Sequence, residues 1–205
     1  MKTKKIMAVA VASTMMLSLV GCGGSEAFKK NSDALIDAAK EHGAEKLAGG
    51  KDITDYDNGG YDTSTKSDDM AAVNTILSDV KRIDTEDIKI ATLFMDYKDS
   101  NNYIQGVVCD FSSADIAEDF FNDAVDTIED MIEGTDAFVT DLDDTAYYIG
   151  FDYAGMEIYY TIAYEDTALT YVQMIGTDSS FTNDAKEFMS DFSDKGGYKD
   201  PTDLV

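Results

Sequence analysis

The sequence of 205 residues has few of the residues that enzymes most often use for catalysis. It contains one histidine, two cysteines and no tryptophan, and 41 acidic residues outnumber its 16 basic ones. Serine hydrolases, cysteine proteases and zinc enzymes normally place a histidine beside their other active groups. The chain also has no Gly-x-Ser-x-Gly, no His-Glu-x-x-His and no glycine-rich phosphate loop. These absences argue against all of these enzyme classes.

The histidine and the internal cysteine each have an ordinary structural interpretation. His42 precedes Gly43 at the end of a predicted helix, where a histidine commonly interacts with the last carbonyl groups. We therefore expect His42 to be exposed and to take no part in catalysis. Cys109 lies on the apolar face of a predicted strand with no basic neighbour, which favours a buried thiol over a nucleophile.

Positive charge is scarce throughout the chain, whose formal net charge is −25 at pH 7. A surface this negative repels nucleic acid and anionic lipid head groups, and no cluster of basic residues offsets it. The composition therefore predicts no nucleic-acid partner. It also favours a protein that stays soluble and monomeric.

The N-terminus, in contrast, carries a clear targeting signal. Three lysines among the first five residues precede an apolar run over residues 6–20, which as a helix reaches roughly 22 Å and falls short of the roughly 30 Å hydrocarbon core of a bilayer. The run ends in Leu19-Val20-Gly21-Cys22. This segment resembles the lipobox of bacterial lipoproteins, in which the cysteine receives a diacylglycerol before the peptide is cut ahead of it.

The resemblance implies that Cys22 is lipidated and holds the protein on the extracytoplasmic face of the cell membrane. The alternative is an ordinary secretory leader or an anchor helix with an incidental cysteine, and the small Gly21 at the cleavage position argues against it. Cleavage would remove three lysines and no acidic residue. The mature chain of 184 residues would then have 13 basic and 41 acidic residues, a net charge of −28.

These features divide the chain into four parts. They are a lipoprotein signal peptide (1–21), the lipidated cysteine with a flexible tether (22–26), a single acidic α+β domain (27–193) and a polar tail that we expect to be loose (194–205).

Hydrophobic periodicity predicts four helices and five strands within the domain. Helical spacing of apolar residues indicates helices over residues 26–47, 69–83, 113–133 and 179–192. Alternation of apolar and polar residues indicates strands over residues 88–97, 103–111, 147–153, 156–165 and 168–176, with a further short strand near 60–63 in a glycine- and aspartate-rich loop. Because short links favour hairpins, we expect an α+β fold with a single antiparallel sheet of about five strands and helices mainly on one face.

Oxygen-rich loops can bind calcium without histidine or thiolate ligands. Asp55, Asp57 and Gly60 fit positions one, three and six of a twelve-residue calcium loop, and Asp62 adds a further carboxylate. Lys66, however, stands where the bidentate glutamate is needed. We therefore expect no cofactor, with a calcium site at Asp55, Asp57 and Asp62 as the alternative.

Tyrosines are concentrated in the last three predicted strands. Because side chains alternate between the two faces of a strand, these rings cannot all enter one core. Some of them should lie on an open sheet face and contact a protein or glycan, with Tyr148, Tyr159 and Tyr171 as the binding candidates. The alternative is that tyrosine simply suits a half-exposed sheet.

The sequence as a whole predicts a membrane-anchored extracytoplasmic lipoprotein that serves as a non-catalytic binding or interaction module. A calcium-dependent surface module is the first alternative. A carboxylate-based hydrolase is the second, although 41 acidic residues offer too many pairs for the sequence to select one. A hydrolase would show two buried acids that converge in a cleft with raised pKa values.

Overall fold

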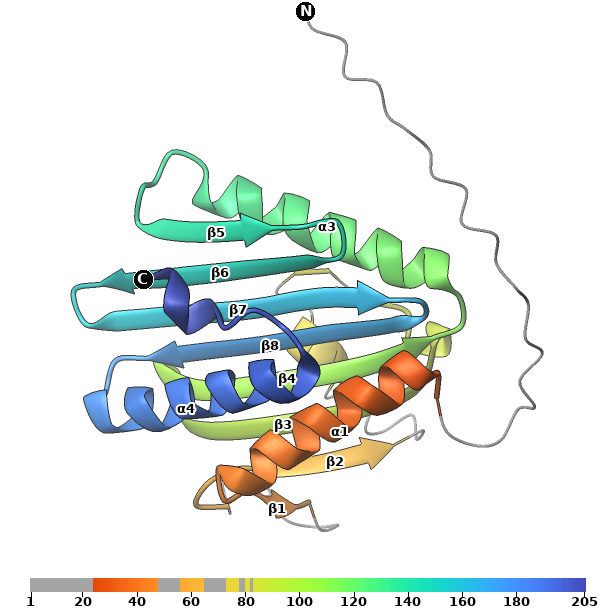
Figure 1. Cartoon of the computed structure of the whole chain (residues 1–205), viewed down its shortest axis with the longest axis horizontal. Helices are drawn as coiled ribbons and strands as arrows, with labels where there is room; N and C mark the ends of the chain where they lie inside the picture. Colours follow the sequence, from red (N-terminus) through yellow and green to blue (C-terminus); the bar gives the residue numbers. More distant parts are fainter. Residues whose placement is uncertain (1–23, 48–55, 65–72, 78–79, 82) are drawn as a thin grey trace, which may run out of the picture.

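A computed structural model describes residues 24–47, 56–64, 73–77, 80–81 and 83–205. In this part of the chain, eight strands form one sheet in the order β1-β2-β3-β4-β8-β7-β6-β5 (Figure 1). The strands are β1 (Glu45–Lys46), β2 (Gly60–Ser64), β3 (Ile88–Asp99), β4 (Asn102–Phe111), β5 (Phe138–Leu142), β6 (Ala146–Tyr153), β7 (Met156–Glu165) and β8 (Ala168–Gly176). The helices are α1 (Glu26–Glu41), α3 (Ala114–Ile132) and α4 (Ser179–Gly196), with the short 3₁₀ helices η2 (Thr85–Asp87) and η3 (Pro201–Leu204) and a helical segment over 73–77. The predicted α+β fold with a single sheet is confirmed.

The five strands expected from alternation are confirmed, and their short links produce the expected antiparallel pairs. β3 pairs with β4, and β6, β7 and β8 form a meander. The turn between β6 and β7 places Ala154 at a φ of 55° and Gly155 at a φ of 84°, the two positive values that a tight hairpin of this type requires. β4 then pairs with β8 and joins the two groups, with Val107 opposite Tyr171.

The sheet is larger than predicted, with eight strands rather than about five. β2 lies where a short strand was expected and pairs with β3. β1 was missed because its two residues were predicted as the end of the first helix, over 26–47, which instead ends at Glu41. β5 was missed because it is a half-exposed edge strand with little apolar pattern. The sheet is also not purely antiparallel, since β1 pairs with β2 in parallel.

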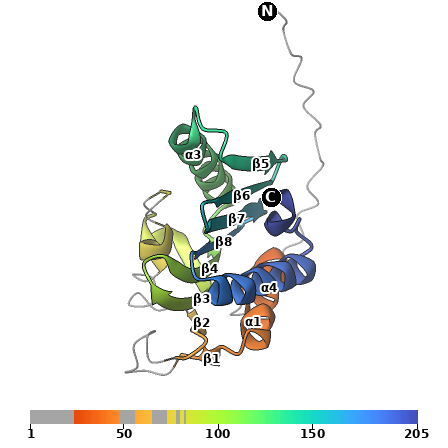
Figure 2. The same ribbon diagram turned by 90° about the vertical axis from the view of Figure 1, so that its left-hand side faces the viewer.

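Helices cover both faces of the sheet, so the prediction of helices mainly on one face was wrong (Figure 2). α3 and residues 73–77 pack on the face that carries Val107 and Tyr171. α1 and α4 pack on the opposite face, which carries Phe94 and Val108. The physical reason is that the central strands present apolar side chains in both directions, and an apolar face left open to water would be unfavourable.

The C-terminal tail packs on the domain rather than being loose. α4 continues to Gly196, and the ring of Tyr198 stacks on Phe192 with 5.4 Å between ring centroids. The hydroxyl of Tyr198 donates to Oγ1 of Thr170 at 3.2 Å. η3 then lies against β6, with Pro201 buried, so the tail completes the cover over this face of the sheet.

Candidate functional site

The structure tests only part of the predicted calcium site. Cys22 and Asp55 lie outside the described residues. Asp57 is exposed, and Oδ1 of Asp62 on β2 lies 3.7 Å from Nζ of Lys46. Within the described ranges, no three histidine, cysteine, aspartate or glutamate side chains converge on a point that could hold a metal ion. Calcium binding through Asp55 therefore stays a prediction.

The three tyrosines named as binding candidates are buried. Tyr148, Tyr159 and Tyr171 are at most 3% exposed. The C-terminal tail covers Tyr148, and α4 covers Tyr159. Tyr171 lies in the core between the sheet and α3. A ring without exposed surface cannot contact a partner. The side chains that cover both faces of the sheet thus remove the contact surface that we expected from these residues.

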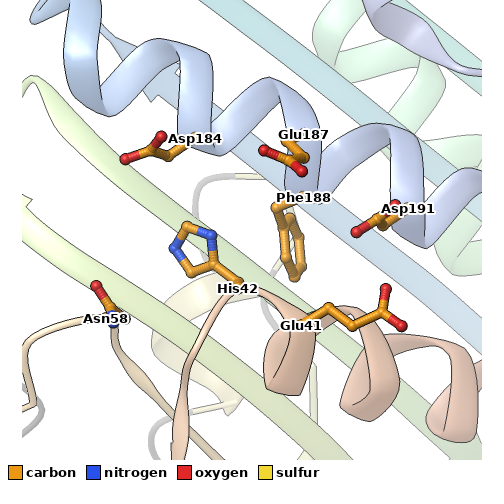
Figure 3. Close-up of a pocket in the computed structure, with 7 residues that line it drawn as sticks. All are labelled: Glu41, His42, Asn58, Asp184, Glu187, Phe188 and Asp191. Carbon is orange, nitrogen blue, oxygen red and sulfur yellow. The ribbon is translucent and has the colours of Figure 1, made fainter.

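A different site lies between the C-terminal end of α1 and the side of α4 (Figure 3). It is a pocket of about 480 Å³ that residues from α1, α4 and the segment before β2 surround. The residues that line it are Glu41, His42, Asn58, Asp184, Glu187, Phe188 and Asp191. We refer to it as the His42 pocket.

His42 lies at the inner end of this pocket. The prediction that it would be exposed was wrong. Its side chain is only 9% exposed, and its Nε2–H donates to Oδ2 of Asp96 on β3 at 2.9 Å. The ring packs edge-on against Phe94 and Phe188, with centroids 6.0 and 5.8 Å apart. Within the described part of the chain, the second ring nitrogen, Nδ1, has no hydrogen-bond partner. In the neutral ring, Nδ1 is an acceptor.

Two glycines bring the segment before β2 against this histidine. Gly43, which follows the C-cap residue His42, has a φ of +93°, and a Cβ there would lie 2.8 Å from Nδ2 of Asn58. Gly59 has a φ of +80°, and a Cβ there would lie 2.4 Å from the carbonyl oxygen of Met95 on β3. Only glycine fits both conditions at these positions. The close approach places Asn58 in the wall of the pocket.

The outer part of the pocket is acidic. Asp184, Glu187 and Asp191 extend from one side of α4, and Glu41 faces them from α1 (Figure 3). Nζ of Lys195 donates to Oε2 of Glu41 at 2.6 Å, and this hydrogen bond lowers the pKa of Glu41. Burial raises the pKa of Asp191, and the charge of Glu41 adds to this effect while Lys195 opposes it.

The comparisons with known proteins assign no family. No family model matches the chain, and no curated protein matches it. Among solved structures, the extracellular domain of PknH from Mycobacterium tuberculosis is similar, with 15% sequence identity over 86% of this chain and 99% of that chain and a TM-score of 0.46. None of the described helices is long and apolar enough to cross a membrane.

Among the described residues that line the pocket, none is a serine, threonine, cysteine or tyrosine. Cys109 is buried in the core on the opposite face of the sheet, as predicted, and burial raises its pKa. The two neighbouring acids of the pocket differ: the side chain of Glu41 is 57% exposed and its pKa is lowered, whereas the pKa of Asp191 is raised by burial.

Most of this pocket was missed from the sequence. Glu187 and Asp191 follow Asp184 by three and seven positions. This spacing places the three acids on one side of a helix, so the sequence could have predicted that they lie together. Phe188 lies on the buried side of the helix that the sequence predicted over 179–192. The pairing of His42 with Asp96, 54 residues away, gives no signal in the sequence because it depends on where α1 packs on β3.

Proposed function

We propose that the protein is a lipid-anchored extracytoplasmic lipoprotein whose α+β domain binds a small ligand in the His42 pocket without catalysing a reaction. The anchoring rests on the lipobox that ends at Cys22. The net charge supports a monomer without a nucleic-acid partner. A protein or glycan contact at the cell surface stays a prediction, but the burial of the three tyrosines leads us to place ligand binding in the pocket.

The observation that carries the proposal is the state of the His42 ring. An imidazole that is held in one orientation by a carboxylate can present its second ring nitrogen to a ligand. The His42 side chain is nine-tenths buried, and Asp96 fixes the orientation of its ring. His42 itself lies in the lining of the pocket, so its ring is held in place beside a space that a ligand could enter. A ligand in the pocket could form a hydrogen bond with Nδ1 of this ring.

None of the described residues that line the pocket is a nucleophile, and this supports binding without catalysis. A histidine held by a carboxylate is the usual partner of a serine or cysteine nucleophile. The side chains that line the pocket besides His42 are four carboxylates, an amide and a phenyl ring. Glu41, Asp184 and Glu187 are exposed to solvent, where they can attract a ligand.

The anchoring is tested by the mass of the N-terminal peptide and by detergent phase partition. We expect a diacylglycerol and an acyl chain on Cys22, and we expect the protein to enter the detergent phase. The variant Cys22→Ala should lose both properties, and Cys109→Ala should keep both. An unmodified Cys22 would refute the anchoring, and so would equal membrane association of Cys22→Ala.

Ligand binding is tested by thermal unfolding of the full chain with a panel of small cationic, neutral and anionic compounds. A compound that binds the native state raises the melting temperature. We expect at least one compound to stabilise the wild-type protein and not His42→Gln. If no compound separates the two proteins, the pocket is not a ligand site.

A further inference from the structure

β5 forms one edge of the sheet, and its outer side pairs with no strand in the described part of the chain (Figure 1). Proteins usually protect such an edge with a lysine, a proline, a β-bulge or a covering segment, because an open edge is a template for a further strand. β5 contains no lysine or proline, and its register with β6 has no shift. The edge is therefore able to accept an added strand.

The backbone groups that point outward from β5 follow from its pairing with β6. The N–H of Asp143, just beyond the strand, donates to the carbonyl oxygen of Ala146 at 2.9 Å. Hydrogen-bonded pairs alternate along an antiparallel ladder, so every second residue of β5 turns its N–H and C=O groups toward β6. The residues that turn these groups outward are Phe138, Thr140 and Leu142. None of the described residues bonds to the outward groups.

Exposed apolar side chains lie on both faces of this edge. Leu142 is exposed on the α3 face, where it lies opposite Tyr147. Val139 is exposed on the other face, where it lies opposite Gly150. The exposed Val205 is close by, since its Cγ2 is 2.9 Å from the position that a Cβ of Gly150 would take. An added strand would cover apolar surface on both faces, because its side chains alternate.

The charges around the edge indicate which kind of strand fits it. The sequence has no lysine or arginine between residues 99 and 185. Lys199 from the tail reaches Asp141, with 2.7 Å between Nζ and Oδ2. Exposed acids that form no salt bridge with a described residue lie on both sides of the strand, and they are Glu133, Asp136, Asp143 and Asp144. A second copy of the chain would bring the same acids to the edge, and like charges on neighbouring strands repel.

We propose that the outer edge of β5 binds an extended segment of a basic partner protein, which adds to the sheet as a further strand. The segment has an apolar centre and lysine or arginine residues at both ends. Its backbone pairs with Phe138, Thr140 and Leu142, its centre packs on the apolar side chains of the edge, and its cations lie beside the flanking acids. This surface is separate from the His42 pocket, which α1 and α4 form, so the proposal does not depend on the proposed ligand.

The first test is isothermal titration calorimetry on the full chain in nonionic detergent at a salt concentration of about 0.15 M, where attraction beyond about 8 Å is screened. The probe is the peptide Lys-Lys-Val-Thr-Val-Thr-Val-Lys-Lys. We expect it to bind at least about tenfold more tightly than the same peptide with its five central backbone amides methylated, which keeps the charge but cannot donate to a strand. A peptide with glutamate in place of each lysine should not bind.

The second test is hydrogen exchange of the full chain followed by nuclear magnetic resonance. The peptide should slow exchange at the outward N–H groups of Phe138, Thr140 and Leu142. Exchange at Val139 and Asp141 should change little, because their N–H groups already face β6. Binding by charge alone would not produce this alternation.

Two variants and one matched control assign the peptide to the edge. Thr140→Lys places a cation at the centre of the edge and should weaken peptide binding at least about tenfold. Ser100→Lys adds the same charge in the exposed turn between β3 and β4 and should leave the affinity within about twofold of wild type. Thr140→Pro removes one outward N–H without adding charge, at a position where an edge strand tolerates proline, and should also weaken binding.

Each other outcome would overturn the proposal. Equal binding of the methylated peptide, or equal loss in Thr140→Lys and Ser100→Lys, would show that the peptide responds to overall charge. Binding of the glutamate peptide would exclude a basic partner, and a dimer of the chain that Thr140→Lys dissociates would show that a second copy occupies the edge. No binding of the lysine peptide would also refute the proposal. His42→Gln should bind the peptide as wild type does, so failure at the edge leaves the His42 pocket as a ligand site unaffected.

Discussion

The hydrogen bond between His42 and Asp96 should contribute strongly to stability, and a double-mutant cycle can measure it. The two side chains are only 9% and 12% exposed, and their atoms are 2.9 Å apart. Hydrogen bonds that involve a charged group contribute about 1.5–3 kcal/mol when both partners are buried. We therefore expect a coupling free energy in this range between His42→Ala and Asp96→Ala.

The same helix supplies an internal control. Lys40 and Asp37 are 3.1 Å apart on α1, a similar distance, but their side chains are 52% and 57% exposed. Water and salt screen such a pair, and the cost of ordering two long side chains offsets most of the attraction. The coupling between Lys40→Ala and Asp37→Ala should accordingly be indistinguishable from the error of the measurement.

The assay is urea denaturation followed by circular dichroism at pH 7, with the free energy of unfolding determined for each member of both cycles. Circular dichroism is suitable because the chain has no tryptophan. If the coupling of His42 with Asp96 does not exceed that of Lys40 with Asp37, the histidine is not held as the structure indicates. The orientation of Nδ1 into the pocket would then lose its support.

Three further predictions concern the surroundings of the site. Gly134→Ala should cost about 1–2 kcal/mol, because Gly134 has a positive φ but open space around its Cβ position. Gly43→Ala should destabilise the protein more, because the added Cβ would also meet Asn58. Equal unfolding midpoints of the two variants in urea would contradict this. Tyr198→Ala should lower the free energy of unfolding by about 2–3 kcal/mol, and a change of less than about 0.5 kcal/mol would mean that the tail does not pack on the sheet. Backbone N–H groups at the start of α4 lower the pKa of Asp178, so the stabilisation from its charge is present above about pH 4 and lost as the pH falls through the lowered pKa. The stability difference between wild type and Asp178→Ala, measured by thermal unfolding, should therefore narrow toward acid pH and not widen.

The strands were predictable because their pattern is local. Alternation over β6, β7 and β8, with links of two residues, determines both the faces of the side chains and the antiparallel pairing. The cover on both faces was missed although a signal for it existed. β4 places Ile104 and Val108 on one face and Val107 and Cys109 on the other, which is typical of a strand buried on both sides.

The site was less predictable because it depends on contacts between distant segments. His42 at the end of α1 meets Asp96 of β3, and α4 reaches the same place from the other end of the chain. A helix C-terminus tells nothing about which strand it will meet. The local pattern therefore favoured an exposed histidine, and only the packing of α1 across the sheet shows that it is buried.

The start of α1 gives the proposed anchor a definite geometry. Ser25 bonds through its N–H and its hydroxyl to the carboxylate of Asp110 on β4, and it follows Cys22 by only three residues, about 10 Å of extended chain. The 16 residues of α1 then extend about 24 Å from Ser25 to His42. In a lipidated protein, α1 would work as a rigid spacer whose length limits how far from the bilayer the mouth of the pocket can stand. Shortening or lengthening α1 by whole turns would change the largest distance between the pocket and the bilayer surface.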